Sequence, residues 1–125
     1  MLISVRDTGK YDRGVFAEKE IQSNDLIEAS PVIIIEKKEC KYIKKTILSN
    51  YFFIWGEDYS KAAIALGYGS LINHSYQPNV RFEVNSKNRT IDFYAIQTIA
   101  PGDEITINYN GDPDDVAPLW FDPIT

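Results

Sequence analysis

Short apolar stretches, separated by polar residues and ended by turn residues, run through most of the chain. In several of them apolar and polar positions alternate, which predicts β-strands with one buried face. The predicted strands are residues 2–6, 15–17, 26–36, 80–84, 91–98 and 105–109. Pro31 interrupts the third of these, and because proline cannot donate a ladder hydrogen bond, it predicts a sheet edge or a bulge there.

The clearest local feature is a β-hairpin formed by residues 80–84 and 91–98. A polar connector, residues 85–89, joins the two strands, which is typical of longer hairpin loops. The apolar residues that alternate along it are Phe82, Val84, Ile91, Phe93 and Ala95.

Helical spacing is weaker. One short helix is predicted by Cys40, Ile43, Ile47 and Leu48. The apolar runs 51–55 and 62–66 are too short to assign. Together, the pattern predicts a mostly β protein with one or two short helices, and a length of 125 residues is typical of a single domain, 1–125.

The charge is unevenly distributed. Residues 37–45 carry five lysines and one glutamate, which leaves 8 of the 13 cationic and 17 of the 18 acidic residues elsewhere, against a net charge of −5 overall. An acidic body repels nucleic-acid phosphates and attracts a basic peptide, so we expect no direct nucleic-acid binding. The lysine run is interpreted as a solvated helix face or loop rather than a binding patch.

Cys40 is the only cysteine and His74 the only histidine, which excludes an intramolecular disulfide and a thiolate-rich zinc site, and we expect no metal. No apolar run is long enough to span a membrane, and the first residues do not resemble a secretory signal. We therefore expect a soluble, intracellular protein with no membrane contact.

Candidate chemistry is concentrated around His74, which lies among Asn73, Ser75, Pro78 and Asn79. Taken alone, such a histidine is more often a loop residue satisfied by the backbone than part of a ligand site. A nucleophilic pair with Ser75 is geometrically poor, because adjacent side chains diverge, and no Gly-x-Ser-x-Gly elbow is present.

Two segments resemble the signature motifs of the SET-domain protein lysine methyltransferases. Residues 73–79 match Asn-His-Ser-x-x-Pro-Asn at every defined position, and residues 104–109 are similar to the closing Glu-Leu-x-x-Asp-Tyr. Ile105 and Asn108 replace the usual leucine and aspartate of that closing motif.

Two further segments extend the resemblance over residues 3–110. Residues 13–17, Arg-Gly-Val-Phe-Ala, are similar to the opening Gly-x-Gly-Val-Phe-Ala, with Asp12 in place of the first glycine. Residues 67–69, Gly-Tyr-Gly, lie where SET domains carry a short glycine-containing segment. The compact chain is similar to the small SET proteins of viruses and bacteria.

The resemblance implies a β-clip fold whose last motif threads beneath the loop preceding it, a core of 3–110 and a tail of 111–125. It implies an enzyme that uses S-adenosylmethionine to methylate a lysine of a basic protein or peptide, for which a histone tail is one candidate. The cofactor contacts that it implies are Arg13, Gly14, Val15, Asn73, His74, Tyr109 and Trp120.

Tyr109 is the implied catalytic residue, and Tyr51 is a second active-site candidate that could equally be a core aromatic. The substrate-channel candidates are Tyr51, Phe82, Ile107 and Phe121. Trp120 or Phe121 could cover the adenine, close the channel or simply anchor the tail. Because neither Phe82 nor Ile107 carries a hydroxyl that could hold a crowding water, we expect di- or trimethylated product.

Two other functions stay open. One is a catalytically silent SET-like module that binds a peptide or partner. The other, a small hydrolase or nuclease, lacks a recognisable set of acids, bases and metal ligands. A homodimer and a cytoplasmic or nuclear location are both compatible with the sequence.

Overall fold

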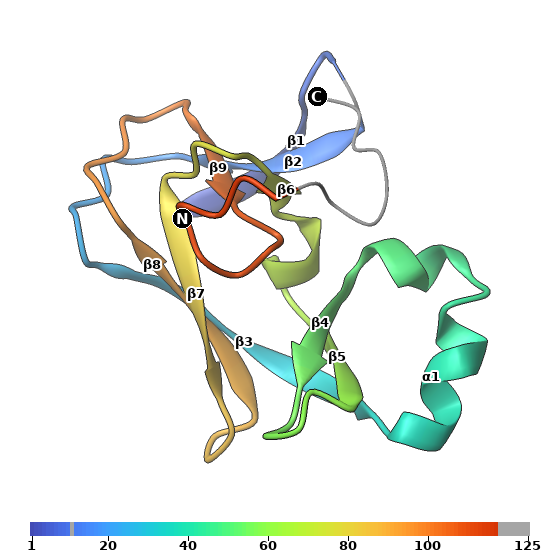
Figure 1. Ribbon diagram of the computed structural model, residues 1–125. Helices are drawn as coiled ribbons and strands as arrows, with labels where there is room; N and C mark the ends of the chain where they lie inside the picture. Colours follow the sequence, from blue (N-terminus) through green and yellow to red (C-terminus); the bar gives the residue numbers. More distant parts are fainter. Residues whose placement is uncertain (11, 118–125) are drawn as a thin grey trace.

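The computed structural model describes residues 1–10 and 12–117, and these form two β-sheets with little helix (Figure 1). The strands of the first sheet, in spatial order, are β1 (Ile3–Asp7), β2 (Arg13–Ala17), β9 (Glu104–Ile107) and β6 (Asn73–His74). The strands of the second sheet, in spatial order, are β4 (Phe52–Trp55), β5 (Lys61–Ala65), β3 (Leu26–Ile35), β8 (Thr90–Ala95) and β7 (Val80–Asn85). The mostly β fold predicted from the sequence is confirmed.

The predicted hairpin is present as β7 and β8, which pair antiparallel from Val80 opposite Ala95 to Asn85 opposite Thr90. The second strand is shorter than predicted and ends at Ala95. Ile99 lies beyond it and forms an isolated bridge with Ile21. Residues 96–98 were predicted to continue the strand but lie outside it, although the Ile96 N–H still donates to Asn79 O at 3.0 Å.

Strand β3 changes partner along its length, which explains how a proline fits inside it. Residues 26–31 pair with β8, and residues 32–35 pair with β5 on the other side. Pro31 lies at the changeover, where its carbonyl accepts a hydrogen bond from the Leu66 N–H at 2.8 Å. The bulge expected near Pro31 instead falls between Leu26 and Glu28.

The short helix predicted from Cys40, Ile43, Ile47 and Leu48 is present, but it ends before Ile47 and a separate short helix follows it. The α-helix α1 (Lys37–Ile43) ends before Thr46, which adopts extended backbone angles. The Thr46 Oγ1 atom then accepts the Leu48 N–H at 3.2 Å and starts the 3-10 helix η1 (Ile47–Asn50). Neither helix buries a residue, and together they protrude from one side of the molecule (Figure 1). No helix in residues 1–10 and 12–117 is long and apolar enough to cross a membrane.

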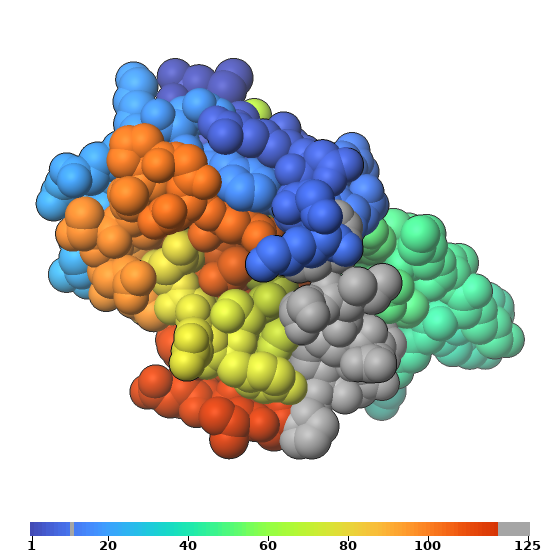
Figure 2. All heavy atoms as spheres, turned by 90° about the horizontal axis from the view of Figure 1, so that it is seen from above, coloured from blue at the N-terminus to red at the C-terminus, as the bar shows by residue number. Residues whose placement is uncertain are grey.

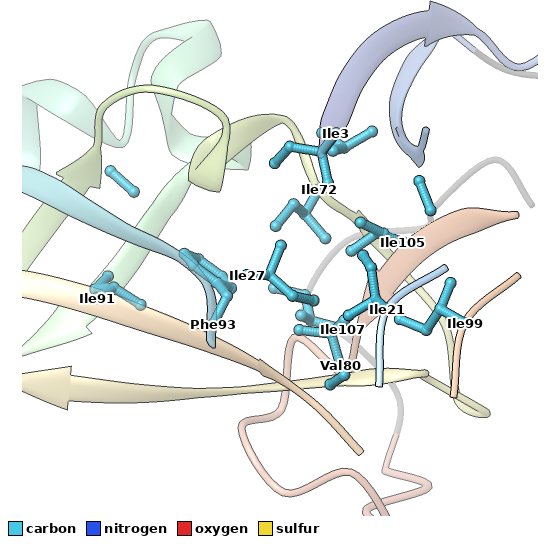
Figure 3. Packing of buried hydrophobic residues seen from close by; sticks show 14 of the residues in the cluster. Ile3, Ile21, Ile27, Ile72, Val80, Ile91, Phe93, Ile99, Ile105 and Ile107 are labelled. Atoms are coloured by element: carbon cyan, nitrogen blue, oxygen red, sulfur yellow. The ribbon is translucent and has the colours of Figure 1, made fainter. Parts of the chain in front are cut away.

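The hydrophobic core lies where the two sheets meet. Ile105 and Ile107 of β9 are fully buried and pack with Ile72, which precedes β6, and with Ile21 and Val80 (Figure 3). Ile91 and Phe93 of β8 continue this core beneath the second sheet (Figure 3). A second 3-10 helix, η2 (Gly69–Leu71), leads from β5 into β6.

Strand β9 is inserted between β2 and β6, which gives the threaded arrangement that the motifs imply. It pairs in parallel with β6, Asn73 opposite Thr106 and His74 opposite Ile107, and the Ser75 N–H donates to Ile107 O at 2.9 Å. The Asn79 side chain fixes the loop after β6 to the same strand. Its Nδ2 donates to Glu104 O at 2.8 Å and its Oδ1 accepts the Thr106 N–H at 2.9 Å.

Replacing Asn79 with alanine should destabilise the fold, because two backbone groups of β9 would lose their partners in a partly buried place. We expect a loss of about 2 kcal/mol or more in the free energy of unfolding. Urea unfolding followed by circular dichroism measures it. Asn88→Ala, in the exposed turn between β7 and β8, is the matched control and should stay within about 0.5 kcal/mol of the parent. Equal stability of the two variants would show that Asn79 does not hold β9.

Candidate active site

The parallel pairing of β6 with β9 brings His74 against Tyr109. The backbone N–H of Tyr109 donates to His74 Nδ1 at 3.0 Å, and the two ring centroids lie 5.1 Å apart. The Tyr109 hydroxyl donates to the carbonyl oxygen of Ile72 at 2.8 Å. Tyr109 is therefore held at its backbone and at the tip of its side chain, both times by the segment that carries His74.

The hydrogen bond to Nδ1 also sets the state of the imidazole. Since Nδ1 accepts, the neutral ring carries its proton on Nε2. His74 is only 5% exposed, and Nε2 has no hydrogen-bond partner in the described part of the chain. Burial lowers the pKa of His74 below its ordinary value of 6.5. Burying a neutral N–H donor without a partner lowers the stability of the fold. Such a donor is suited to bind a ligand atom that accepts a hydrogen bond.

Asn73 faces the opposite way from His74, because neighbouring residues of a strand point to opposite sides. Its Nδ2 donates to Arg13 O at 3.0 Å and to Glu104 Oε2 at 2.8 Å. Gly14 lies directly against this pair, and a Cβ there would be 2.5 Å from Glu104 Oε2 and 2.9 Å from Asn73 Nδ2. Only a glycine permits this close approach of β2 to the two polar side chains, so Arg13, Gly14, Asn73 and Glu104 form one polar cradle.

An open cavity of about 930 Å³ begins at Tyr109 and extends between the edges of the second sheet. Its wall is rich in aromatic residues, among them Tyr51, Phe53, Tyr59, Phe82 and Tyr109, and it also includes Lys44. Phe53 and Phe82, from the two edge strands β4 and β7, make an edge-to-face contact with ring centroids 5.2 Å apart. The curled sheet therefore turns its two edges toward one cavity.

Tyr51 is positioned by Ser70, which sequence reasoning did not single out. The Ser70 Oγ donates to Tyr51 O at 3.1 Å and accepts the Ala65 N–H at 3.0 Å. Ser70 itself lines the cavity in the short helix η2. The one sign in the sequence that Ser70 belongs to the site is its position directly after the glycine segment 67–69. A single serine has no periodicity that would have marked it out.

The structure brings most of the predicted site residues into two neighbouring groups. Arg13, Gly14 and Asn73 meet in the cradle, whereas Tyr51, Phe82 and Tyr109 line the cavity and His74 adjoins Tyr109. Val15 is fully buried opposite Ile105. Trp120 and Phe121 lie outside the described residues.

Ile107 was predicted to line the substrate channel, but it is fully buried in the core and is not part of the cavity wall. The reason is the alternation of β9, in which Ile105 and Ile107 face inward. Tyr109 escapes that pattern because it follows the end of the strand.

A family model described as the SET domain matches residues 12–110. In Schizosaccharomyces pombe, a histone-lysine N-methyltransferase specific for lysine 37 of H3 is 36% identical over 121 residues, covering 96% of this chain and 77% of that protein. The histone-lysine N-methyltransferase set1 of Dictyostelium discoideum is 31% identical over 114 residues, which is 85% of this chain but only 8% of the much longer protein.

Solved structures resemble the fold of this chain. The crystal structure of a candidate histone methyltransferase of Plasmodium falciparum superimposes with a TM-score of 0.71 and 31% identity, over 86% of this chain and 91% of that one. A humanized mutant of the Chaetomium thermophilum Polycomb Repressive Complex 2, bound to the inhibitor GSK126, gives a TM-score of 0.73 at 18% identity. It covers 86% of this chain and 14% of that one, and it supports the fold alone.

The buried imidazole should make the stability depend on pH in the mildly acidic range. Because the folded-state pKa of His74 lies below 6.5, the neutral ring contributes stability that is complete above pH 6.5. That contribution is lost as the pH falls through the folded-state pKa, where a proton on Nδ1 would face the Tyr109 N–H.

His74→Asn is the informative variant, since its Oδ1 can replace Nδ1 as acceptor but does not titrate. Melting temperatures measured between pH 8 and 5 should fall less steeply below pH 6.5 for His74→Asn than for the parent. Parallel curves for the two proteins would show that His74 is not the titrating group.

Proposed function

The chain belongs to the SET-domain family of histone-lysine methyltransferases, and we propose that it transfers methyl groups from S-adenosylmethionine to a lysine of a histone or another basic protein. The family makes the protein a lysine methyltransferase; the cofactor contacts, the residue roles and the substrate are our proposals. The observation that carries them is the position of Tyr109. It lines the aromatic cavity and is bound to the segment whose other face forms the polar cradle.

The residues present fit the cofactor. It is an amino acid joined through a sulfonium to adenosine, so it needs acceptors for an ammonium and donors for ring nitrogens and a carboxylate. Glu104 and the backbone around Arg13, Gly14 and Val15 would supply the acceptors at the cradle. The Nε2–H of His74, which has no partner within residues 1–10 and 12–117, would supply a donor. Asn73 would hold the amino-acid end, as its place in the motif implies. When bound, the cofactor supplies an electrophilic methyl group.

The cavity would receive the target lysine as an amine. A lysine ammonium has a pKa near 10.4, so only about one side chain in 10³ is neutral at pH 7. Aromatic walls disfavour the charged form by desolvation, although ring faces offset part of that cost. Neither a carboxylate nor an imidazole lines the cavity in the described part of the chain. The lysine therefore loses its proton to water, not to a protein base, and turnover should rise with pH.

Tyr109 would align the amine with the methyl group. Its hydroxyl proton is donated to Ile72 O, so the lone pairs of the phenol oxygen can accept from an amine N–H or a polarised methyl C–H. Methyl transfer from a sulfonium moves a positive charge and creates none, so alignment rather than charge neutralisation is what the site must provide. Tyr51, just before β4, and Phe82, on β7, would confine the lysine side chain from two sides.

The substrate would be a basic peptide. Outside residues 37–45 the chain carries 17 acidic against 8 basic residues, which attracts a lysine-rich segment. The Schizosaccharomyces pombe relative is named for lysine 37 of histone H3. A histone tail is accordingly the first substrate to test.

Tyr109→Phe tests the assigned catalytic role. The variant should bind S-adenosylmethionine within a few-fold of the parent in a calorimetric titration, yet turn over roughly 10² times more slowly on a histone peptide. Tyr42→Phe, on the exposed face of α1, is the matched control and should keep full activity. Unchanged turnover in Tyr109→Phe would remove the residue from this role. If the parent failed to bind the cofactor, a silent peptide-binding module would be the better description.

Phe82→Tyr tests how many methyl groups are added. In the family, a phenol beside the amine holds a water that crowds out further methylation, and Phe82 lines the cavity without a hydroxyl. The parent should therefore give di- or trimethylated peptide, and Phe82→Tyr should shift the product toward fewer methyl groups. Mass spectrometry of the peptide reads both. Product that stops at one methyl group in the parent would contradict the proposal.

A further inference from the structure

Asn108, immediately before Tyr109, is a buried amide that uses both of its N–H donors and one lone pair of its oxygen locally. It is 2% exposed. Its Oδ1 accepts the Asn110 N–H at 3.0 Å, while its Nδ2 donates to Asp115 O at 2.6 Å and to Pro113 O at 3.4 Å. The orientation of the amide is fixed by chemistry, because a backbone N–H can only meet the oxygen and a carbonyl can only meet the nitrogen.

The segment that Asn108 holds, residues 110–117, folds back onto the site. The carbonyl of Ala117 accepts from Asn110 Nδ2 at 2.8 Å and from the Tyr76 hydroxyl at 3.0 Å. The Tyr76 ring meets the His74 ring edge to face, with centroids 4.4 Å apart. Figure 2 shows the loop after His74 (yellow-green) at the surface beside the segment that follows Tyr109 (red).

These contacts close a loop of interactions around the catalytic tyrosine. From Tyr109 the chain runs through residues 110–117 to Ala117, which binds Tyr76, and Tyr76 packs on His74, which accepts the Tyr109 N–H. Displacing the tail would leave the outer side of the His74 ring without its support. The amide of Asn108 lies at the centre of the tail and is buried, whereas the contacts at Ala117 are exposed.

We propose that Asn108 is a positioning residue, whose two amide donors clamp residues 110–117 against Tyr76 and thereby hold the His74–Tyr109 pair in its working geometry. This inference rests on the proposed function of that pair. The residue type matters, because the closing motif usually has aspartate at this position. An ionised aspartate offers acceptors only and would repel the carbonyls of Pro113 and Asp115.

Asn108→Asp therefore turns the clamp into one that depends on pH. The new carboxyl would be buried, and the tail around it carries Asp112, Asp114 and Asp115, so desolvation and like charges both raise its pKa. The Asn110 N–H opposes this by stabilising the ionised form. Protonated, the group can donate one hydrogen bond to a tail carbonyl. Ionised, it can donate none.

The decisive measurement compares kcat/KM of the parent and Asn108→Asp from pH 6 to 9 on one histone peptide. Parent activity should rise with pH. Asn108→Asp should fall at least about tenfold behind the parent at pH 9, the scale of losing a positioning contact, and recover to within about threefold at pH 6. Asn88→Asp adds the same charge in the β7–β8 turn and should follow the parent throughout. A constant ratio between Asn108→Asp and the parent at every pH would overturn the proposal.

Hydrogen exchange of residues 110–117 gives a readout that needs no activity. Asn108→Asp should exchange this segment at least about tenfold faster than the parent at pH 9, after correction for intrinsic rates, while β8 stays protected. Full tail protection at that pH would overturn the clamp. A loosened tail with unchanged turnover and cofactor affinity would overturn the positioning role. Loosening without any detectable methyl transfer by the parent would instead count against the proposed function.

Tyr76→Phe keeps the test decisive if Asn108→Asp fails to fold. Tyr76 is 40% exposed, so removing its hydroxyl leaves the core intact and cuts only the contact with Ala117 O. We expect faster exchange of the tail and a severalfold higher KM for S-adenosylmethionine, with the same ratio to the parent at every pH. Tail exchange and KM equal to those of the parent would show that the tail does not support the His74–Tyr109 pair.

Discussion

The structure depends on one short interaction, the parallel pairing of Asn73 and His74 with Thr106 and Ile107. Two residues of β6 meet a strand that comes about thirty residues later, after the β7–β8 hairpin has been completed. So brief a ladder contributes little by itself, and parallel pairing is slightly weaker per residue than antiparallel pairing. The pairing is reinforced by the Asn79 side chain, which forms hydrogen bonds with two backbone groups of β9. It is also reinforced by Ile105 and Ile107, which are buried beneath it.

The register of that pairing determines the chemistry. Asn73 and His74 are adjacent and point to opposite sides, so one joins the polar cradle at Gly14 and the other supports Tyr109. A slip by one residue would exchange the two faces, with an amide where the imidazole is needed. Gly14 limits the cradle from the other side, because its missing Cβ allows Asn73 and Glu104 to approach β2. The site is therefore specified by strand register more than by loop conformation.

Sequence reasoning found the elements whose apolar residues recur with a regular period, and it misjudged where some of them end and which contacts their residues make. The hairpin of residues 80–95 follows from alternation because each strand buries one face against the same core. The predicted helix is present but shorter than residues 40–48, because the Thr46 side chain caps a new turn instead of continuing the first helix. Ile107 was assigned to the channel from its closeness to Tyr109, yet the alternation that predicted β9 also sends Ile107 into the core. The clamp at Asn108 could not be predicted from the sequence, because it depends on two backbone carbonyls of a tail without regular secondary structure.

Most polar groups around Tyr109 are neutral, and this suits a reaction that moves a charge already present. His74 is kept neutral by burial, Asn73, Asn79 and Asn108 are amides, and the Tyr109 hydroxyl is bound to a backbone carbonyl. Two charged side chains lie close by: Glu104 is held in the cradle and Lys44 is on the cavity wall, while the acidic body can attract a basic substrate from a distance. A cation on the wall disfavours the ammonium form of a bound lysine, in the same sense as desolvation does. Neutral amides supply directional contacts without shifting the protonation of the amine, so in the proposed reaction the protein would align the amine and leave its deprotonation to the solvent.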